Sequence, residues 1–159
     1  MVCDMIVTKR IYNKELIRSI IQMSEIWDCV AEDGQAKDDF DPDVENECWL
    51  LMNNEDSIVA LYNLHGINGV TVQIHAHVIP EYRKEYSKQT GKAALDYIIE
   101  NTGYYKIIAI VPVIYNNVKR FCESFGFKEE GISRLSYQKN GEIIDQWLLG
   151  LTRCEYLNG

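Results

Sequence analysis

Residues 70–83 read VTVQIHAHVIPEYR, and this stretch decides which fold the chain can adopt. Apolar residues alternate with other residues between Val70 and Ile79, a period of two that predicts a long β-strand. A helical pattern follows from about Tyr86 to Glu100. Residues 106–111 then form an apolar run, stopped by Pro112, of the kind that is buried in a parallel sheet. The sequence therefore predicts a strand–helix–strand unit.

Outside this unit the sequence predicts short elements on both sides. Asn13 offers an N-cap to a first helix, and a second short helix precedes an acidic loop over residues 32–47. Asn140-Gly141 is a strong signal for a type I′ hairpin between the last two strands. The other expected elements are strands over residues 5–9, 48–52 and 57–64 and a helix over residues 115–125 that ends at Gly126. The resulting order is β-α-α-β-β-β-α-β-α-β-β.

The composition is typical of one soluble globular domain. The chain has 159 residues, of which 47% are hydrophobic and 25% charged, which suffices for one core and argues against global disorder. No internal repeat or low-complexity linker divides it, so we expect a single domain over residues 1–159. No apolar run approaches the roughly 20 residues of a membrane helix, and the N-terminus does not resemble a signal peptide. Five scattered cysteines without a CxxC pair favour a reducing compartment, so we expect a cytoplasmic protein without a zinc site.

The net charge of −8 is unevenly distributed along the chain. Between Glu25 and Asp56 there are 12 acidic residues and a single base, Lys37. This segment would repel a polyanion, so nucleic acid is not an expected partner. It can attract a cationic amine or a basic peptide, although acidic runs of this kind also occur as solvated loops.

Three stretches, together with the element order, resemble the GNAT acetyltransferase superfamily. His77 to Arg83, HVIPEYR, looks like the family's V-x-P-E-Y-R at the end of the fourth strand. Residues 116–131, NNVKRFCESFGFKEEG, are similar to N-x-x-A-x-x-x-Y-x-x-x-G-F-x-x-E-G, and the ending GEIIDQWLLGLTR suits the closing strand. The resemblance implies an α/β fold with a mixed, mostly antiparallel sheet of about seven strands and helices on both faces. Because GNAT sheets often pair through their last strands, it also implies a homodimer.

In GNAT proteins the fourth and fifth strands part at their C-terminal ends, and the pantetheine arm of coenzyme A lies between them. The resemblance implies that Val78 and Ile79 pair with this arm through their backbone. The diphosphate of acetyl-CoA then lies at the N-terminus of the next helix, where N–H groups and the helix dipole favour an anion. The residues implied to bind the cofactor there and on the later helix are Arg83, Lys84, Tyr86, Ser87, Lys88 and Asn116.

The chain departs from the family pattern at two places. The phosphate loop R-x-x-G-x-G/A has small residues where this chain has Tyr86 and Lys88, and a shifted alignment would use Gly91 and Ala93. Many members have a tyrosine that protonates the leaving thiolate, and this chain has Cys122 there. Two hypotheses therefore stand: an acetyl-CoA-dependent N-acetyltransferase acting on an amine, or a catalytically inactive GNAT-fold binding or structural module. The segment after PEYR and the final hairpin also look like GNAT-like proteins of tailed bacteriophages.

Candidate catalytic residues lie on the predicted fourth strand and on the helix after the fifth. His75 and His77 share one face of the strand near its end, and histidine titrates in the range that suits a base for an ammonium proton. The alternative interpretation is a hydrogen-bonded pair between sheet and helix. Glu81 is a second candidate base. Cys122 is either a candidate nucleophile or a small apolar residue that fills the core.

Overall fold

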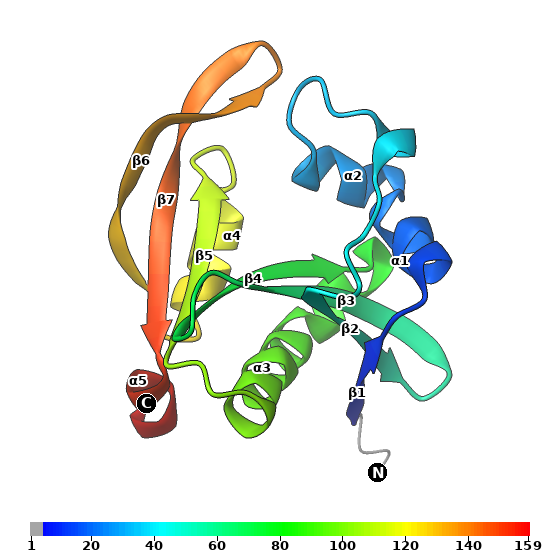
Figure 1. Ribbon diagram of the computed structural model, residues 1–159, viewed down its shortest axis with the longest axis vertical. Coiled ribbons are helices and arrows are strands. Elements are labelled where there is room, and N and C mark those ends of the chain that lie inside the picture. The colour runs from blue at the N-terminus through cyan, green and yellow to red at the C-terminus, as the bar shows by residue number, and fades with distance from the viewer. Residues whose placement is uncertain (1–4) are drawn as a thin grey trace. The chain divides into compact units, whose positions relative to one another are not determined.

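The computed structural model describes residues 5–159, which form a seven-stranded mixed sheet and five α-helices (Figure 1). The strands are β1 (Ile6–Ile11), β2 (Glu47–Asn54), β3 (Ser57–Gly66), β4 (Thr71–Val78), β5 (Lys106–Pro112), β6 (Lys128–Lys139) and β7 (Glu142–Thr152). The helices are α1 (Lys14–Ile21), α2 (Ser24–Val30), α3 (Arg83–Asn101), α4 (Asn116–Glu123) and α5 (Arg153–Asn158), with short 3-10 helices η1 (Lys37–Asp39) and η2 (Pro80–Tyr82). None of the helices in the described part is both long and apolar enough to cross a membrane. Cys3 lies outside the described residues.

The predicted element order and fold class are confirmed. The strands follow the order β1-β2-β3-β4-β5-β7-β6 in the sheet. β2 is antiparallel to β1 and to β3, β4 is parallel to β5, and β7 is antiparallel to β5 and to β6. The structure adds α5, which the sequence pattern did not indicate. Thr152 begins this helix with a capping box, in which its side chain accepts from the N–H of Glu155 and the Glu155 carboxylate accepts from the N–H of Thr152.

By their contacts, the residues group into two compact units. The first unit contains the chain up to Ala31, Ala36–His65 and His75–Thr102, and the second contains Glu32–Gln35, Gly66–Ile74 and Gly103–Gly159. Each unit buries apolar side chains of its own. The single domain expected over residues 1–159 stays a prediction.

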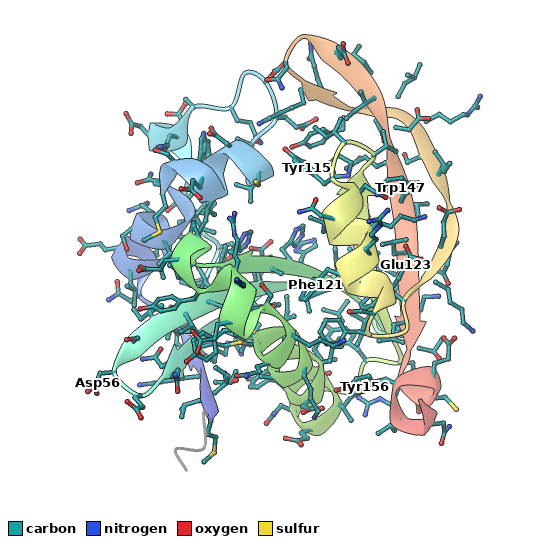
Figure 2. All side chains as sticks on the ribbon, turned by 180° about the vertical axis from the view of Figure 1, so that it is seen from behind. Asp56, Tyr115, Phe121, Glu123, Trp147 and Tyr156 are labelled. Carbon is teal, nitrogen blue, oxygen red and sulfur yellow. The ribbon has the colours of Figure 1, made fainter. Side chains whose placement is uncertain are left out.

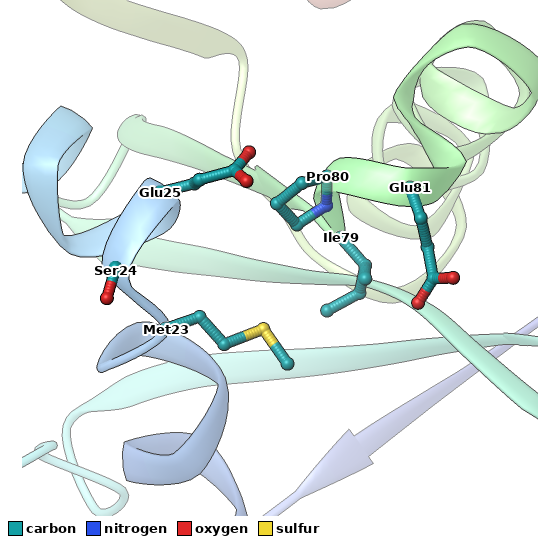
Figure 3. Close-up of a pocket in the computed structure, with 6 residues that line it drawn as sticks. All are labelled: Met23, Ser24, Glu25, Ile79, Pro80 and Glu81. Carbon is teal, nitrogen blue, oxygen red and sulfur yellow. The ribbon is translucent and has the colours of Figure 1, made fainter.

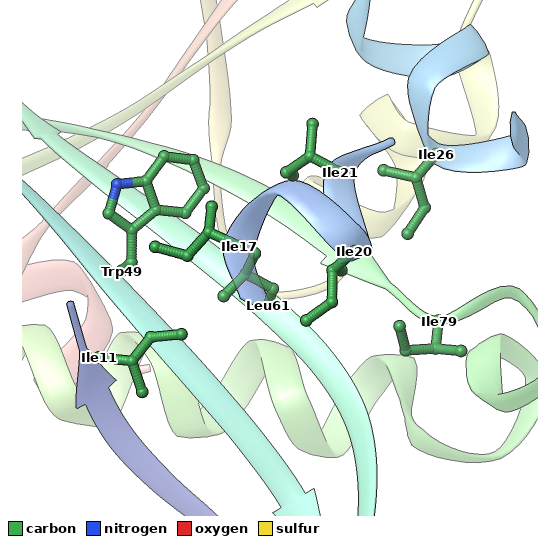
Figure 4. Packing of buried hydrophobic residues seen from close by; sticks show 8 residues of the cluster. All are labelled: Ile11, Ile17, Ile20, Ile21, Ile26, Trp49, Leu61 and Ile79. Atoms are coloured by element: carbon green, nitrogen blue, oxygen red, sulfur yellow. The ribbon is translucent and has the colours of Figure 1, made fainter. Parts of the chain in front are cut away.

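In the first unit, α1 and α2 cover one face of the strands and α3 covers the other (Figure 1). The Asn13 side chain caps α1 as predicted, accepting from the N–H of Leu16 at 3.1 Å. After this cap, the apolar residues on one side of α1 pack against β2 and β3. The buried cluster comprises Ile11, Ile17, Ile20, Ile21, Ile26, Trp49, Leu61 and Ile79 (Figure 4). On the opposite face, the buried hydroxyls of Tyr62 and Thr90 share a hydrogen bond of 3.1 Å between β3 and α3.

The central strand is shorter than the pattern predicted. β4 ends at Val78, and of the predicted apolar face Val72 and Val78 are buried whereas Ala76 is exposed. Its parallel pairing with β5 joins residues 71–73 to residues 106–108 rather than running along the whole strand. The expected parting of β4 from β5 beyond these pairs stays a prediction.

Helix α3 begins at Arg83, three residues before the start that its apolar pattern indicated. The reason is the short turn η2, which has Pro80 in its first turn and runs directly into α3. Proline is favoured at the start of a helix because its fixed φ suits the helical conformation and its missing N–H would have no partner there. The cationic residues after Pro80 therefore lie in the helix itself, at its first turns.

In the second unit, the predicted hairpin and helix end are confirmed. Asn140 and Gly141 have φ values of 53° and 78° between β6 and β7, the left-handed pair that a type I′ turn requires. The carboxylate of Asp33 holds this turn by accepting from the N–H groups of Asn140 (2.9 Å) and Gly141 (2.7 Å). Gly126 follows α4 with φ +100°. Helix α4 lies beside β7, where the Lys119 ammonium is 4.9 Å from the ring centroid of Trp147 (Figure 2).

Candidate functional site

At the end of β4, most backbone N–H and C=O groups form hydrogen bonds within the first unit. The N–H of Ile79 donates to the carbonyl of Val59 (2.9 Å), and the Ile79 carbonyl accepts from the N–H of Tyr82 (2.8 Å). The Val78 carbonyl accepts from Nε of Arg83 at 3.3 Å. Neighbouring residues of a strand direct their backbone groups to opposite edges, so the N–H of Val78 points away from β3. Two residues are implied to pair with pantetheine. Of these, Val78 has the backbone N–H that is better oriented for this pairing.

The start of α3 carries three exposed cations and one exposed acid, Glu85, on the surface. Arg83, Lys84 and Lys88 are exposed within the first two turns, and Ser87 lies among them, half-buried. The N-cap residue, Tyr82, places no side-chain hydrogen bond on the helix end. Because the N-terminal dipole of a helix and nearby cations both favour an anion, this segment can bind a diphosphate through side chains.

Tyr86 points into the core, away from the surface of α3. Its side chain is buried, its ring meets that of Tyr82 edge-on at 5.9 Å between centroids, and its hydroxyl accepts from Nδ2 of Asn54. The large residue at a glycine position of the family pattern thus leaves the outside of the helix start uncovered, and its hydroxyl is committed to Asn54. Gly91, used by the shifted alignment, is buried further along α3 and does not lie at its start.

The two histidines of β4 occupy different environments. His77 is 9% exposed, and burial, followed by the nearby His75, lowers its pKa to about 3. The His75 residue is exposed on the surface, and desolvation of its ring by surrounding protein atoms, followed by the charge of His65, lowers its pKa. Within residues 5–159 neither side chain makes a hydrogen bond, so the expected hydrogen-bonded pair is absent there. A buried imidazole with so low a pKa is a weak proton acceptor.

A carboxylate–imidazole pair, which the sequence analysis missed, lies at the neighbouring strands. Glu47 of β2 stands directly opposite His65 of β3, and its Oε1 is 3.0 Å from the imidazole Nδ1. Its Oε2 accepts from Nδ2 of Asn63, a buried residue of β3, at 3.1 Å. Both oxygens of one carboxylate are therefore held in place. The sequence contains no local signal for this pair, because the pair depends on the register between β2 and β3, which residue spacing does not reveal.

The candidates on α4 belong to the second unit. Asn116 is the exposed first residue of the helix, directly after Tyr115 (Figure 2). Cys122 is half-buried, and its burial, followed by the charge of Glu123, raises its pKa to about 11. The thiol is therefore protonated near neutral pH, whereas a nucleophile needs the thiolate. This environment favours the second interpretation of Cys122, a side chain that fills the core.

Part of the acidic segment stabilises the fold. Asp41 pairs with Lys14 (3.3 Å) and Arg18 (2.6 Å), and hydrogen bonds first from Lys14 and then from Arg18 hold its pKa below the usual value. Asp43 accepts from the backbone and side chain of Asn46, which lowers its pKa likewise. The exposed acids of residues 32–47 that have no salt bridge within the described chain include Asp38, Asp39 and Glu45. These three leave a negative surface that a cation can approach.

An open pocket of about 530 Å³ lies within the first unit, between the start of α2 and the junction of β4 with α3 (Figure 3). Glu25 extends toward Pro80 from the α2 side, and Glu81 lines the junction side. The remaining lining residues are Met23, Ser24 and Ile79. Two carboxylates around apolar side chains suit an aliphatic ammonium ion better than an anion.

Three solved structures that are similar to this chain are forms of a spermidine N-acetyltransferase. Spermidine N-acetyltransferase from Vibrio cholerae in complex with CoA and spermine has a TM-score of 0.81 and 19% identity, covering 96% of this chain and 98% of that chain. A chimera of the same enzyme, SpeG, with hSSAT also has a TM-score of 0.81 and 19% identity, with coverage of 97% and 99%. A point mutant of SpeG has a TM-score of 0.78 and 18% identity, with 96% of both chains covered. At these identities the likeness establishes the GNAT fold.

Sequence comparison assigns the family more directly. A comparison with curated protein sequences finds no significant match. A family model described as "Protein of unknown function (DUF2824)" matches residues 8–159, nearly the whole chain. The chain therefore belongs to this family of proteins of unknown function, and its fold is that of the GNAT acetyltransferases.

Proposed function

We propose that the protein is an acetyl-CoA-dependent N-acetyltransferase that acts on a cationic amine. The observation that carries this proposal is the exposed cationic start of α3 directly after β4. It stands in a GNAT fold whose solved neighbours include an enzyme in complex with CoA and spermine. Tyr86 lies in the core and leaves the helix start open, which removes one of the two departures that motivated the inactive alternative; the replacement of the family tyrosine by Cys122 remains the other.

Acetyl-CoA would be held mainly by the first unit. Arg83, Lys84 and Lys88 would bind the diphosphate, with Ser87 as a further donor, and the N–H of Val78 would bind the pantetheine arm. Asn116 of the second unit stays a predicted contact. Side-chain cations replace the glycine-rich backbone of the family pattern, so we expect binding to depend on salt more strongly than binding through backbone amides alone.

The acceptor would be a polyamine or another amine with a flexible aliphatic chain. The pocket lined by Glu25 and Glu81 and the exposed acids Asp38, Asp39 and Glu45 support a cationic acceptor. Spermidine is the first compound to test, because the structural neighbours are spermidine N-acetyltransferases. Electrostatic attraction of this kind raises the association rate and weakens with ionic strength.

Titration calorimetry with acetyl-CoA tests the donor site. We expect the double variant Arg83→Glu/Lys84→Glu to bind acetyl-CoA at least tenfold more weakly, because reversal of two charges repels the diphosphate by about 1.4 kcal/mol or more. The matched control is Arg134→Glu, which reverses an exposed charge on β6. Equal affinity of both variants would remove α3 from the donor site.

Turnover separates the enzyme from an inactive module. Release of free thiol from acetyl-CoA should rise on addition of spermidine and fall at high salt. Binding of acetyl-CoA without acetylation of spermidine or of a panel of primary amines would favour the binding module. Failure of the wild-type protein to bind acetyl-CoA at millimolar concentration would end the proposal.

A further inference from the structure

We propose that His65, held by the carboxylate of Glu47, is the base that takes a proton from the acceptor ammonium, and that Glu47 is its positioning residue. This inference rests on the proposed acetyltransferase function and assigns a residue outside the family motifs. The pair lies entirely in the first unit, on two strands that are hydrogen-bonded to each other.

The contact with the Glu47 carboxylate indicates which nitrogen of His65 can act. A carboxylate oxygen 3.0 Å from Nδ1 calls for a proton on Nδ1, and the neutral ring then has its lone pair on Nε2. The proton is assigned from this contact distance. Because Asn63 holds the other carboxylate oxygen, Glu47 cannot rotate without losing a second bond. The arrangement presents Nε2 in a fixed direction as a proton acceptor.

Exposure distinguishes His65 from the histidines of β4. The side chain of His65 is 48% exposed, so an acceptor can reach its outer edge, while the carboxylate of Glu47 is covered to a greater extent at 24%. His77 is buried and has a pKa of about 3, which makes it a poor base. The titratable groups that interact with the His65 ring are Glu47 on β2 and His75 on β4. His65 thus combines access from solvent with a carboxylate that holds its ring in place.

The proposed step balances as follows. The acceptor ammonium gives one proton to Nε2 of His65, and the neutral amine nitrogen then attacks the carbonyl carbon of the acetyl thioester. A C–N bond forms and the C–S bond breaks, so the sulfur leaves with the bonding electrons as the thiolate of coenzyme A. The nitrogen loses its second proton to give the neutral amide. The thiolate takes up one proton and leaves as the thiol, and the imidazolium returns its proton to solvent.

A purely structural ion pair would have different consequences. A solvent-exposed pair contributes at most about 1 kcal/mol to stability, so its loss would change the unfolding temperature slightly and leave turnover intact. General base catalysis contributes about 10²- to 10⁴-fold to the rate. Stability and rate therefore separate the two roles.

The experiment measures acetyl transfer from acetyl-CoA to spermidine between about pH 6 and 9, a range around the ordinary histidine pKa. We expect H65Q to lower kcat about 10²- to 10⁴-fold with unchanged affinity for acetyl-CoA. Added imidazole should restore part of the rate, and the fall in activity toward low pH should disappear. E47Q should give a smaller loss with the same pH signature. The matched control is E142Q, which removes an exposed carboxylate at the β6–β7 hairpin.

A second measurement covers the case in which H65Q does not fold. Nitrogen-15 NMR of the wild-type ring should show the neutral form protonated at Nδ1, and E47Q should weaken that preference. A wild-type ring protonated at Nε2 would overturn the proposal. Full activity of H65Q beside an active wild type would overturn the role of His65 alone, whereas a wild type that does not bind acetyl-CoA would overturn the proposed function together with it.

Discussion

The two units of the chain use their charged residues differently. Both units contain ion pairs, such as Lys119 with Glu129 (3.1 Å) in the second and Arg18 with Asp41 (2.6 Å) in the first. In the first unit Arg83 and Lys84 are exposed without a salt bridge among the described residues, and the three histidines of the chain lie there together. Charges that satisfy one another hold a fold together, whereas charges without ionic partners remain available to a ligand. The exposed cations of the α3 start and the three histidines are therefore the features that distinguish the first unit, and the proposed chemistry rests on them.

The largest expected effect comes from matched leucine-to-alanine substitutions in the cores of the two units, which test whether the units unfold together. Leu61 in the first unit and Leu149 in the second are both at most 1% exposed. Truncation of either to alanine should lower the free energy of unfolding by about 2–5 kcal/mol, because it removes apolar contacts and leaves a cavity. Urea unfolding followed by circular dichroism measures the loss. One cooperative transition in both variants would support the single domain, and two separate transitions would contradict it.

The two units should also differ in thiol chemistry. The pKa of Cys122 in the second unit is about 11, compared with about 8.5 for an ordinary thiol. At neutral pH its thiolate fraction is lower by roughly two orders of magnitude, so alkylation by iodoacetamide should be about 100-fold slower than for an unperturbed thiol. The exposed thiol of Cys29 in the first unit is alkylated in the same reaction for comparison, and mass spectrometry of the labelled peptides gives both rates. Equal alkylation rates for the two thiols would show that Cys122 is as reactive as Cys29 and would support its role as a nucleophile.

A third difference concerns acid stability, which we attribute to the first unit. A histidine has a pKa of about 6.5 when unfolded, and His77 has one of about 3 when folded. Between these values the unfolded chain binds more protons, so the stability present above about pH 6.5 falls as the pH drops toward 3, by up to about 1.4 kcal/mol per pH unit. His77→Gln should flatten this slope, and exposed His75→Gln should retain most of it. An unchanged slope in His77→Gln would place the acid sensitivity elsewhere.

Several parts of the candidate site could be predicted from neighbouring residues. The cationic start of α3 follows from its position after HVIPEYR, and the cap at Asn13 and the turn at Asn140-Gly141 follow from local rules. The core position of Tyr86 could not be predicted, because it depends on Asn54 at the end of β2. The pair of Glu47 with His65 depends in the same way on the register of two strands. Cytoplasmic location, a homodimer and a bacteriophage origin stay predictions.

The sequence by itself determined the order of the elements, their turns and caps, and the family resemblance. These features are encoded by residues close together in the chain, where side-chain period and backbone preference act directly. The tertiary structure alone decided which histidine is accessible, which carboxylate supports it and where the bulky Tyr86 points. Such properties depend on burial and on contacts between strands and helices distant in sequence, and a shift of one residue in strand register would reverse the face on which every side chain lies.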